Sequence, residues 1–467
     1  MSYVPKALQF RFAELEQFSR ERITIQPSNG NSVVNQGQVI IVDMPYSSLL
    51  EMDSLELHGD FKTVGDANDA AINEVLYAPR NTQSLIESLE IRFNNKVVQQ
   101  ISNYNLLHNK LSDYTSSEDS LKKRHVAGEN SDPSSKVNVD ANDIMDEAVV
   151  KGFHHAAAGV ALADRVDAKK IVIRSLLGFL SSSSTPVLDS GMIGNIQIRI
   201  TLAGAGVLFK SDGLTGGGVS APANTVANPG YSISNIQFKI NRFQMPSAFY
   251  ETMSNNLKSG QKYTIVFDDY QVYSGPSMAN SKTQQLRFTT AATSIKWVMG
   301  TFVLADKDTI GACVVSSPRS NQSLYNKFAN NAAQLLCNSR YFYTTGCGLI
   351  SSQWHVGSAR LPAVPSSKLE CYGNMLTTFN MTEDAQVGTS PHIQTIEGFI
   401  DGNFADFLPL CYTGDDEKLV SGLNTRNLPL SLVWDTVGGG NQTVIPHVFV
   451  CTDKRVHIYG SQQIEIE

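Results

Sequence analysis

The residues best suited to covalent chemistry lie near the C-terminus, where a cysteine is close to two histidines. Cys451 follows His447 by four residues and precedes His457 by six, in a stretch where apolar and polar residues alternate. Alternation indicates a strand, and residues four apart in a strand share a face, so a thiol and an imidazole could meet. The same pattern is typical of a buried strand. We interpret Cys451 and His447 as core or interface residues.

Four consecutive serines, Ser181–Ser184, are a second candidate for a nucleophile. A catalytic serine in a GxSxG motif is presented on a sharp strand-to-helix turn, and the chain contains no such motif. No histidine adjoins the serines in the sequence. We therefore expect the run to be a polar connection between two elements and not a reactive site.

Metal and phosphate sites have weak support in the sequence. His154 and His155 are adjacent and point in different directions in a strand or helix, so we interpret them as exposed loop residues. Asp268 and Asp269 could be paired carboxylates or calcium ligands, but a strand end or turn is the expected context. No two of the six cysteines are closer than ten residues, which excludes CxxC zinc pairs and favours reduced, buried thiols. We expect no metal and no cofactor.

The composition of the 467-residue chain limits the classes of function. Hydrophobic residues make up 42% and allow sizeable cores, while charged residues make up only 17%. That charged fraction is below the quarter or so of typical globular domains, as in a protein whose surface is buried against its own copies. The net charge of −7 argues against a protein that grips phosphate backbones. We find no apolar run long enough for a membrane helix and no secretory signal.

Alternating and apolar runs predict a chain made mostly of strands. Asn94 and Asn95 separate two such runs and predict a hairpin over 88–101, while helical spacing predicts short helices over 8–19, 103–114 and 323–338. Further strands are predicted over 39–45, 54–61, 170–177, 195–203, 232–246, 262–275, 368–379, 396–404, 428–437, 445–453 and 455–460, and a pair of strands over 284–306.

Two polar segments interrupt these strands. Residues 112–150 carry nine acidic and four basic residues among many Ser and Asn, so we expect a surface insertion that is partly helical near Ala141–Val150. Residues 204–230 form a loop rich in Gly, Ala and Pro. Many short strands, long loops and few helices favour two antiparallel β-sandwiches with a boundary near 244–262.

Four stretches together resemble the double jelly-roll major capsid proteins of icosahedral double-stranded DNA viruses, a group of tailless phages, virophages and polinton-like viruses. They are ITIQPSNGNSVVNQGQVIIVDMP (23–45), DSLELHGDF (53–61), SLLGFLSSSSTPVLDSGMIGNIQIRI (175–200) and VIPHVFVCTDKRVHIYG (444–460). The third is similar to the family's short apolar helix, loop and return strand, and the fourth to the last strands of the second roll.

The resemblance implies an all-β chain with two consecutive eight-stranded antiparallel jelly rolls, a few short helices and long loops. It implies an N-terminal arm at 1–22, a first roll at 23–248 and a second roll at 249–467. The insertion at 112–168 and the loop at 204–230 would form towers on the outer side of a shell.

The resemblance also implies how the chain would work. Three copies would form a pseudo-hexagonal homotrimer, and trimers would tile the icosahedral capsid of a virion without catalysis. Implied partners are neighbouring capsomers, penton and minor capsid proteins, and an internal membrane or the genome near the N-terminal segment, with no specific nucleic-acid binding. The chain would be made in the host cell without a signal peptide.

The serine run acquires a structural role in this scheme. The apolar segment Leu176–Leu180 would plug the bottom or side of the first roll. Ile196, Ile198 and Ile200 would point into its core, while Gln197 and Arg199 would face solvent or a neighbouring subunit.

Two other functions stay open from the sequence. A viral spike or lectin-like β-sandwich protein would use the long loops to bind glycans or a receptor, and it would bind them as a monomer. A β-sandwich hydrolase would depend on Cys451 and His447, and its turnover would be lost when they are replaced.

Overall fold

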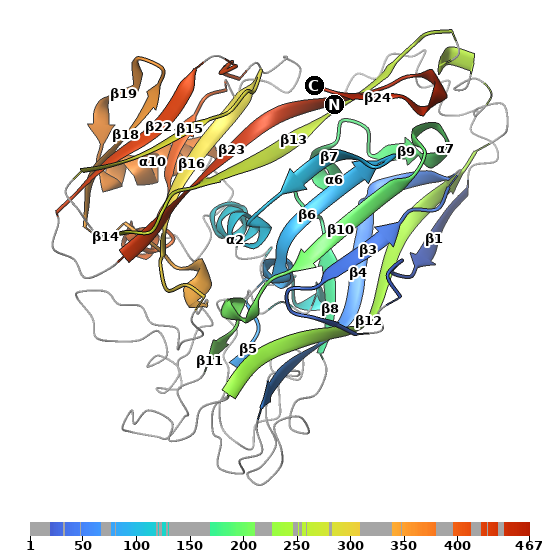
Figure 1. The fold of residues 1–467 in the computed structure, drawn as a ribbon, viewed down its shortest axis with the longest axis horizontal. Coiled ribbons are helices and arrows are strands. Elements are labelled where there is room, and N and C mark those ends of the chain that lie inside the picture. Colours follow the sequence, from blue (N-terminus) through green and yellow to red (C-terminus); the bar gives the residue numbers. More distant parts are fainter. Residues whose placement is uncertain are drawn as a thin grey trace.

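The computed structural model describes residues 19–467 with gaps, of which the longest are 67–75, 130–168, 211–226, 309–338, 380–395 and 412–421. The predicted helix over 323–338 and all but the last residue of the one over 8–19 fall outside the described residues, as does most of the two polar segments. The described residues form two β-sandwiches side by side, whose strands run in broadly the same direction (Figure 1).

The first sandwich is an eight-stranded jelly roll. Its long strands are β1 (Ser19–Ile25), β3 (Val39–Asp43), β4 (Leu49–Asp66), β6 (Ile86–Phe93), β7 (Lys96–Ile101), β8 (Lys169–Arg174), β10 (Ile196–Leu202) and β12 (Ala227–Gln244). One antiparallel sheet has the order β1-β12-β4-β8, and the other has the order β3-β10-β6-β7. This is the Greek-key arrangement of a jelly roll, as the resemblance to capsid proteins implied.

The second sandwich repeats this arrangement strand for strand. Its long strands are β13 (Tyr263–Ser274), β15 (Thr283–Thr289), β16 (Ile295–Leu304), β18 (Leu349–Val356), β19 (Ala359–Ser366), β21 (Asp406–Pro409), β22 (Pro429–Thr436) and β23 (Thr443–Ile458). The order β13-β23-β16 continues to β21, which pairs with β16, and the facing sheet has the order β15-β22-β18-β19. The last strand of the first roll ends at Gln244, and the first strand of the second roll begins at Tyr263.

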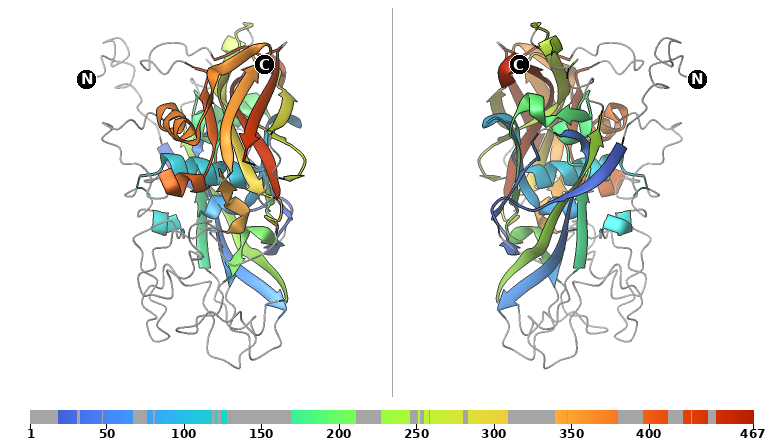
Figure 2. Two further views of the ribbon diagram at one scale, coloured as in Figure 1. Left: turned by 90° about the vertical axis from the view of Figure 1, so that its left-hand side faces the viewer. Right: turned by 90° about the vertical axis from the view of Figure 1, so that its right-hand side faces the viewer.

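Short elements complete the described residues. The short strands are β2 (Val33–Asn35), β5 (Leu76–Tyr77), β9 (Val187–Asp189), β11 (Phe209–Lys210), β14 (Met278–Ala279), β17 (Thr344–Thr345), β20 (Asp401–Gly402) and β24 (Ile464–Ile466). The α-helices are α2 (Tyr104–Thr115), α6 (Phe179–Ser182), α7 (Ser190–Ile193), α10 (Lys368–Thr378) and α11 (Ile396–Ile400). The 3-10 helices are η1 (Thr82–Leu85), η2 (Arg124–Ala127), η3 (Ala205–Val207), η4 (Arg340–Phe342) and η5 (Gly460–Gln462). Figure 2 shows α2 in cyan and α10 in orange on the same flank of the sheets.

Alternation in β10 places its side chains as predicted. Ile196, Ile198 and Ile200 are completely buried in the core of the first roll, whereas Gln197 and Arg199 point to the other face and are partly exposed. The residue pattern therefore fixes which face of this central strand packs against the facing sheet.

The hairpin and the helix that follow one another in the first roll also agree with the sequence. Asn94 and Asn95 connect β6 to β7 with φ angles of 47° and 65°. Two consecutive positive φ angles match the right-handed twist of a two-residue hairpin, and Asn tolerates them better than most residues. Helix α2 covers the predicted 103–114.

Two segments predicted to be strands are helices. Residues 368–379 form α10, which begins with a capping box: Ser367 Oγ accepts from the backbone N–H of Glu370, whose carboxylate accepts from the Ser367 N–H. These reciprocal bonds satisfy N–H groups that a helix leaves free at its start, so the local sequence SKLE favours a helix. Residues 396–404 form α11 and then the short β20.

The two strands predicted over 445–453 and 455–460 are one continuous strand, β23. Lys454 and Arg455 do not end it, because the Lys454 ammonium lies 3.4 Å from a carboxylate oxygen of Asp269. Arg455 exchanges backbone hydrogen bonds with Glu467, next to β24. The structure therefore has one long strand where the sequence predicts two shorter ones.

Candidate functional site at the junction of the two rolls

Cys451 and His447 both lie on β23, but neither is poised for nucleophilic chemistry. Burial raises the pKa of the Cys451 thiol well above its ordinary value and lowers the pKa of His447 to about 4. His447 Nδ1 is 2.7 Å from the hydroxyl oxygen of Ser274. Both groups are therefore neutral near pH 7, and the thiolate that cysteine chemistry requires is strongly disfavoured.

Asp268 and Asp269 lie in the middle of β13, so the prediction of a strand end or turn is wrong. Asp268 forms an ion pair with Lys296, which is also 3.0 Å from Asp453. Asp269 points to the other face and pairs with Lys454. Each carboxylate thus has its own cationic partner, and the two do not converge on one site. Within the part of the chain that the structure describes, no group of three His, Cys, Asp or Glu could hold a metal ion.

The remaining sequence candidates fall outside the described residues. These are His154 and His155 in the polar insertion. Among the described helices, none is long and apolar enough to cross a membrane.

The most elaborate set of buried polar contacts joins the two rolls. Strand β7, at the edge of the first roll, lies beside β13, at the edge of the second (Figure 1). Gln99 of β7 is completely buried between them. Its amide nitrogen donates to the backbone oxygen of Asp268 at 2.9 Å and to a carboxylate oxygen of Asp269 at 3.0 Å. Its amide oxygen accepts from the Phe179 N–H at 2.7 Å.

The apolar segment before the serines packs into this junction. The Phe179 ring makes edge-to-face contacts with Phe93 of the first roll and with Phe267 of the second, at 5.4 and 5.0 Å between centroids. Gly178 has a φ of 81°, and a Cβ there would lie 2.3 Å from the Gln99 amide oxygen. Only glycine fits this position. The apolar segment that was expected to pack at the side of the first roll therefore also packs against the second roll.

The serine run binds the free edge of β13. Ser184 donates its N–H to the Val266 oxygen at 2.8 Å, and its hydroxyl accepts from the Val266 N–H at 3.0 Å. The Ser182 hydroxyl accepts from the Asp268 N–H at 2.8 Å and donates to the Gly178 oxygen at 2.8 Å. The serines thus satisfy main-chain groups that an edge strand would otherwise leave unpaired.

Helix α2 forms a second part of the junction. Tyr114 donates its hydroxyl to the Asn403 backbone oxygen at 2.6 Å, and its ring packs edge-to-face on Phe407 at 5.4 Å. The Lys110 ammonium, which is completely buried, donates to the Gly402 oxygen at 3.0 Å. Because the second roll covers one side of α2 and the first roll the other, nearly all of its residues are buried.

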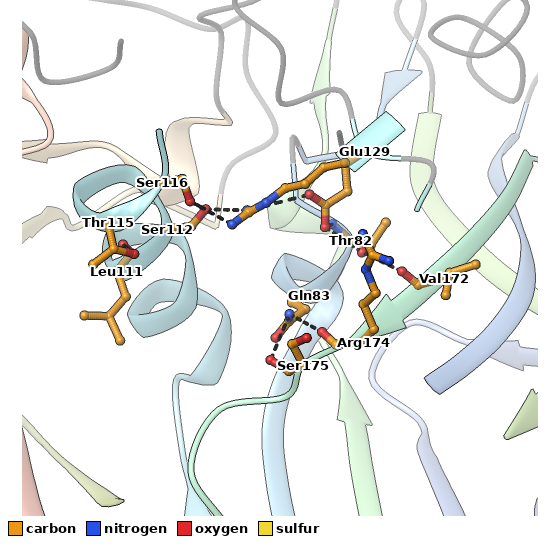
Figure 3. A network of polar contacts seen from close by, with 11 residues as sticks. Thr82, Gln83, Leu111, Ser112, Thr115, Ser116, Glu129, Val172, Arg174 and Ser175 are labelled. Atoms are coloured by element: carbon orange, nitrogen blue, oxygen red, sulfur yellow. Dashed lines mark hydrogen bonds and ion pairs between the residues drawn. The ribbon is translucent and has the colours of Figure 1, made fainter. Parts of the chain in front are cut away.

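A polar network holds α2 to the rest of the first roll (Figure 3). The Arg124 guanidinium donates to the hydroxyls of Ser112 and Ser116, both at 2.7 Å, and lies 3.7 Å from the Glu129 carboxylate. Glu129 in turn accepts from the backbone and hydroxyl of Thr82, in η1. Burial raises the pKa of Glu129 despite the nearby arginine. The network fixes the helix that contacts the second roll.

The C-terminal segment closes the junction at another point. The Lys96 ammonium of β7 donates to the Ile464 oxygen of β24 at 2.9 Å, and Asn94 donates to the Gln462 oxygen at 3.3 Å. The junction therefore involves the hairpin, α2, the serine run and the chain end. Its contacts suit a rigid connection between two rolls and provide no nucleophile, base or metal site. Sequence reasoning missed Gln99, whose partners Phe179 and Asp269 lie 80 and 170 positions away along the chain.

Known proteins match this chain in fold but not in sequence. No protein-family model matches the chain, and the search of curated proteins found no match. Solved structures do match. VP54 of PBCV-1, fitted into a reconstruction of the virophage Sputnik, is 11% identical with a TM-score of 0.58 and covers 96% of each chain. The Faustovirus major capsid protein is 11% identical with a TM-score of 0.55, over 94% of this chain and 90% of that one. The chain has the double jelly-roll fold of major capsid proteins.

A quasi-atomic model of the PBCV-1 virus capsid gives the same double jelly-roll match, at 12% identity and a TM-score of 0.56, over 96% of each chain. The match therefore spans both rolls and the junction between them. At this level of identity the likeness shows only the fold. The residues that build the junction are therefore described for this chain alone.

Proposed function

We propose that this chain is a major capsid protein that forms pseudo-hexagonal homotrimers, which tile an icosahedral virus shell without catalysis. The observation that supports this most strongly is the pair of rolls with the same strand order, fixed side by side by buried hydrogen bonds. One chain then supplies two equal corners of a tile, and three chains supply six. The fold likeness to capsid proteins along almost the whole chain supports the same assignment.

The proposal includes the partners that such a shell needs. Neighbouring trimers, penton proteins and minor capsid proteins would contact the tile, and the N-terminal segment before β1 would face an internal membrane or the genome. The chain would act in the virion. The glycan-binding alternative has no observation in its favour, because most of the loops that it requires lie outside the described residues.

Mass photometry of the purified full-length chain tests the trimer. We expect a main species with the mass of three 51.0 kDa chains, which larger closed particles accompany as concentration rises. A species of one chain at every concentration, under conditions in which the protein is folded, would contradict the proposal.

A further inference from the structure

A row of polar side chains crosses the outer face of the sheet β15-β22-β18-β19, at the left of Figure 1. The strand register places Arg287 of β15 beside Ser431 of β22, and Ser431 beside His355 of β18. His355 in turn lies beside Arg360 of β19. Along each strand these residues alternate with residues of the core, so their side chains share the face that points away from it. The row therefore contains two arginines and a histidine in line.

The arginines of this row have no acid beside them. The Arg287 guanidinium donates to Gln285 Oε1 at 3.1 Å, and among the described residues no carboxylate pairs with Arg287 or Arg360. Both arginines are exposed. The only acid on this face of the four strands is Asp435, which is four positions from Ser431 along β22 and so about 13 Å away. The row is a local excess of positive charge on a chain whose net charge is −7.

The counterpart sheet of the first roll, β3-β10-β6-β7, compensates its charges internally. On its outer face, Arg92 forms an ion pair with Glu90. Arg199 donates to Gln197, which donates in turn to Asp43. Two arginines and two carboxylates therefore balance on that face. Since the two sheets have the same strand order, the uncompensated charge of the second roll comes from its residues and not from the fold.

The length of the row indicates the shape of an anionic partner. Adjacent strands lie about 4.8 Å apart, so Arg287 and Arg360, separated by three such steps, are about 14 Å apart. One small anion cannot contact both. In an extended peptide, side chains two residues apart share a face and are about 6.8 Å apart, so carboxylates at its first, third and fifth positions span about 14 Å. An extended peptide lying across the strands therefore matches the row.

The middle of the row can hold the central carboxylate. The Ser431 hydroxyl accepts from the Gln285 amide at 3.0 Å, which leaves its own proton to donate. A nucleic acid fits less well, because proteins that grip one commonly neutralise about 6–10 phosphates and this row has two arginines. The charge and spacing of the row favour an acidic protein segment.

We propose that the outer face of the β15-β22-β18-β19 sheet binds an extended acidic segment of a partner protein that carries carboxylates at alternate residues. Arg287 and Arg360 hold the two outer carboxylates, and Ser431 donates to the central one. This contact goes beyond the proposed function, because it requires no contact between copies of this chain.

Fluorescence anisotropy with the full-length chain tests this contact. The probe is a labelled five-residue peptide in which three glutamates alternate with two threonines. We expect the peptide to bind the wild type, and its Kd to rise about threefold in Arg287→Glu or Arg360→Glu and about tenfold in the double variant, because exposed ion pairs are individually weak. Arg199→Glu is the matched control. It reverses a charge on the counterpart face of the first roll and should leave the Kd unchanged.

Three results would overturn the inference. The first is a Kd that is the same for the wild type and the folded double variant, or no binding to either. The second is equally tight binding of a peptide with three consecutive glutamates, because its carboxylates do not match the row. The third is a heparin oligosaccharide that binds the wild type more tightly than the peptide and loses affinity in the double variant, which would assign the row to an acidic polysaccharide.

Two further measurements keep these outcomes separate from folding and assembly. The melting temperature of the double variant should equal that of the wild type, because Arg287 and Arg360 are exposed. Mass photometry of the same samples reports the oligomeric state. A wild type that binds the peptide but forms no trimer would contradict the proposed function alone, and a trimer that does not bind it would contradict this inference alone.

Discussion

Buried polar residues determine how firmly the rolls are joined. Gln99 is the central case, since its one side chain bonds to the main chain before the serines and to both aspartates of β13. A buried amide with all its bonds made contributes modestly, but its loss leaves several groups unsatisfied. The alternating pattern of 88–101 predicted the strand that carries Gln99, whereas its partners depend on how two distant parts of the chain pack.

Replacing Gln99 should therefore weaken the junction. We expect Gln99→Leu to lower the free energy of unfolding by about 1–3 kcal/mol, because the Phe179 N–H and the Asp269 carboxylate lose their partner in a buried site. Gln100→Leu is the matched control, since Gln100 is the next residue of β7 and is exposed. Urea unfolding of both variants measures the difference, and equal midpoints would show that the Gln99 contacts are dispensable.

Asp406 is a buried acid inside the second roll. It is 1% exposed, and the Cys371 thiol lies 3.6 Å from its carboxylate. Burial raises its pKa from 3.8 to about 6. Because the folded state favours the protonated acid, this group contributes stability that is fully present below pH 3.8 and is lost as the pH rises through about 6.

Asp406→Asn should isolate this effect. Asn resembles the protonated acid, so we expect the variant to be more stable than the wild type by about 3 kcal/mol near pH 8, with the difference vanishing toward pH 4. Comparing variant with wild type at each pH cancels the opposite contribution of His447, whose pKa burial lowers to about 4. Thermal unfolding across this range is the measurement. Asp308→Asn, at a side chain 77% exposed, should show no such trend. A difference independent of pH would refute this role of Asp406.

At the scale of elements, the serine run is a cap for an edge strand. The sequence predicted a polar connection at Ser181–Ser184, and the structure shows that alternate serines have different tasks. Ser182 and Ser184 bond to β13, while the Ser183 hydroxyl bonds to Thr185 within its own turn. The sequence could not assign this task, because β13 begins about 80 residues later.

Because only Ser182 and Ser184 bond to β13, substitutions of Ser181 and Ser183 provide a control within the same run. We expect the double variant Ser182→Ala, Ser184→Ala to speed amide exchange at Val266 and Asp268 by about fivefold, because each lost neutral hydrogen bond is worth about 1 kcal/mol. Ser181→Ala with Ser183→Ala should leave these two amides unchanged. Hydrogen exchange followed by mass spectrometry resolves the peptide, and identical rates in both double variants would rule out the cap.

The elements that sequence reasoning misassigned share a physical cause. The segment that forms α10 has apolar residues compatible with either period, and the decisive information was the capping box between Ser367 and Glu370. In β23 the charged residues in the middle indicated a break, and their partners on β13 and at the chain end were not visible locally. Elements with one clear period, such as β10 and α2, were predicted correctly.

At the scale of the whole molecule, the repeated strand order is the property that connects structure to function. Two rolls of one design, fixed by a rigid junction, make a chain that can present similar edges at regular positions around a ring. The general class of fold followed from strand patterns and from the resemblance of four stretches. The junction that makes two rolls into one unit required the three-dimensional structure.

Electron microscopy of the purified full-length chain tests this account most directly. Class averages should show flat particles with a pseudo-hexagonal outline and six similar lobes, two from each of three chains. Single two-lobed particles of one chain, persisting at high protein concentration in a folded sample, would contradict it.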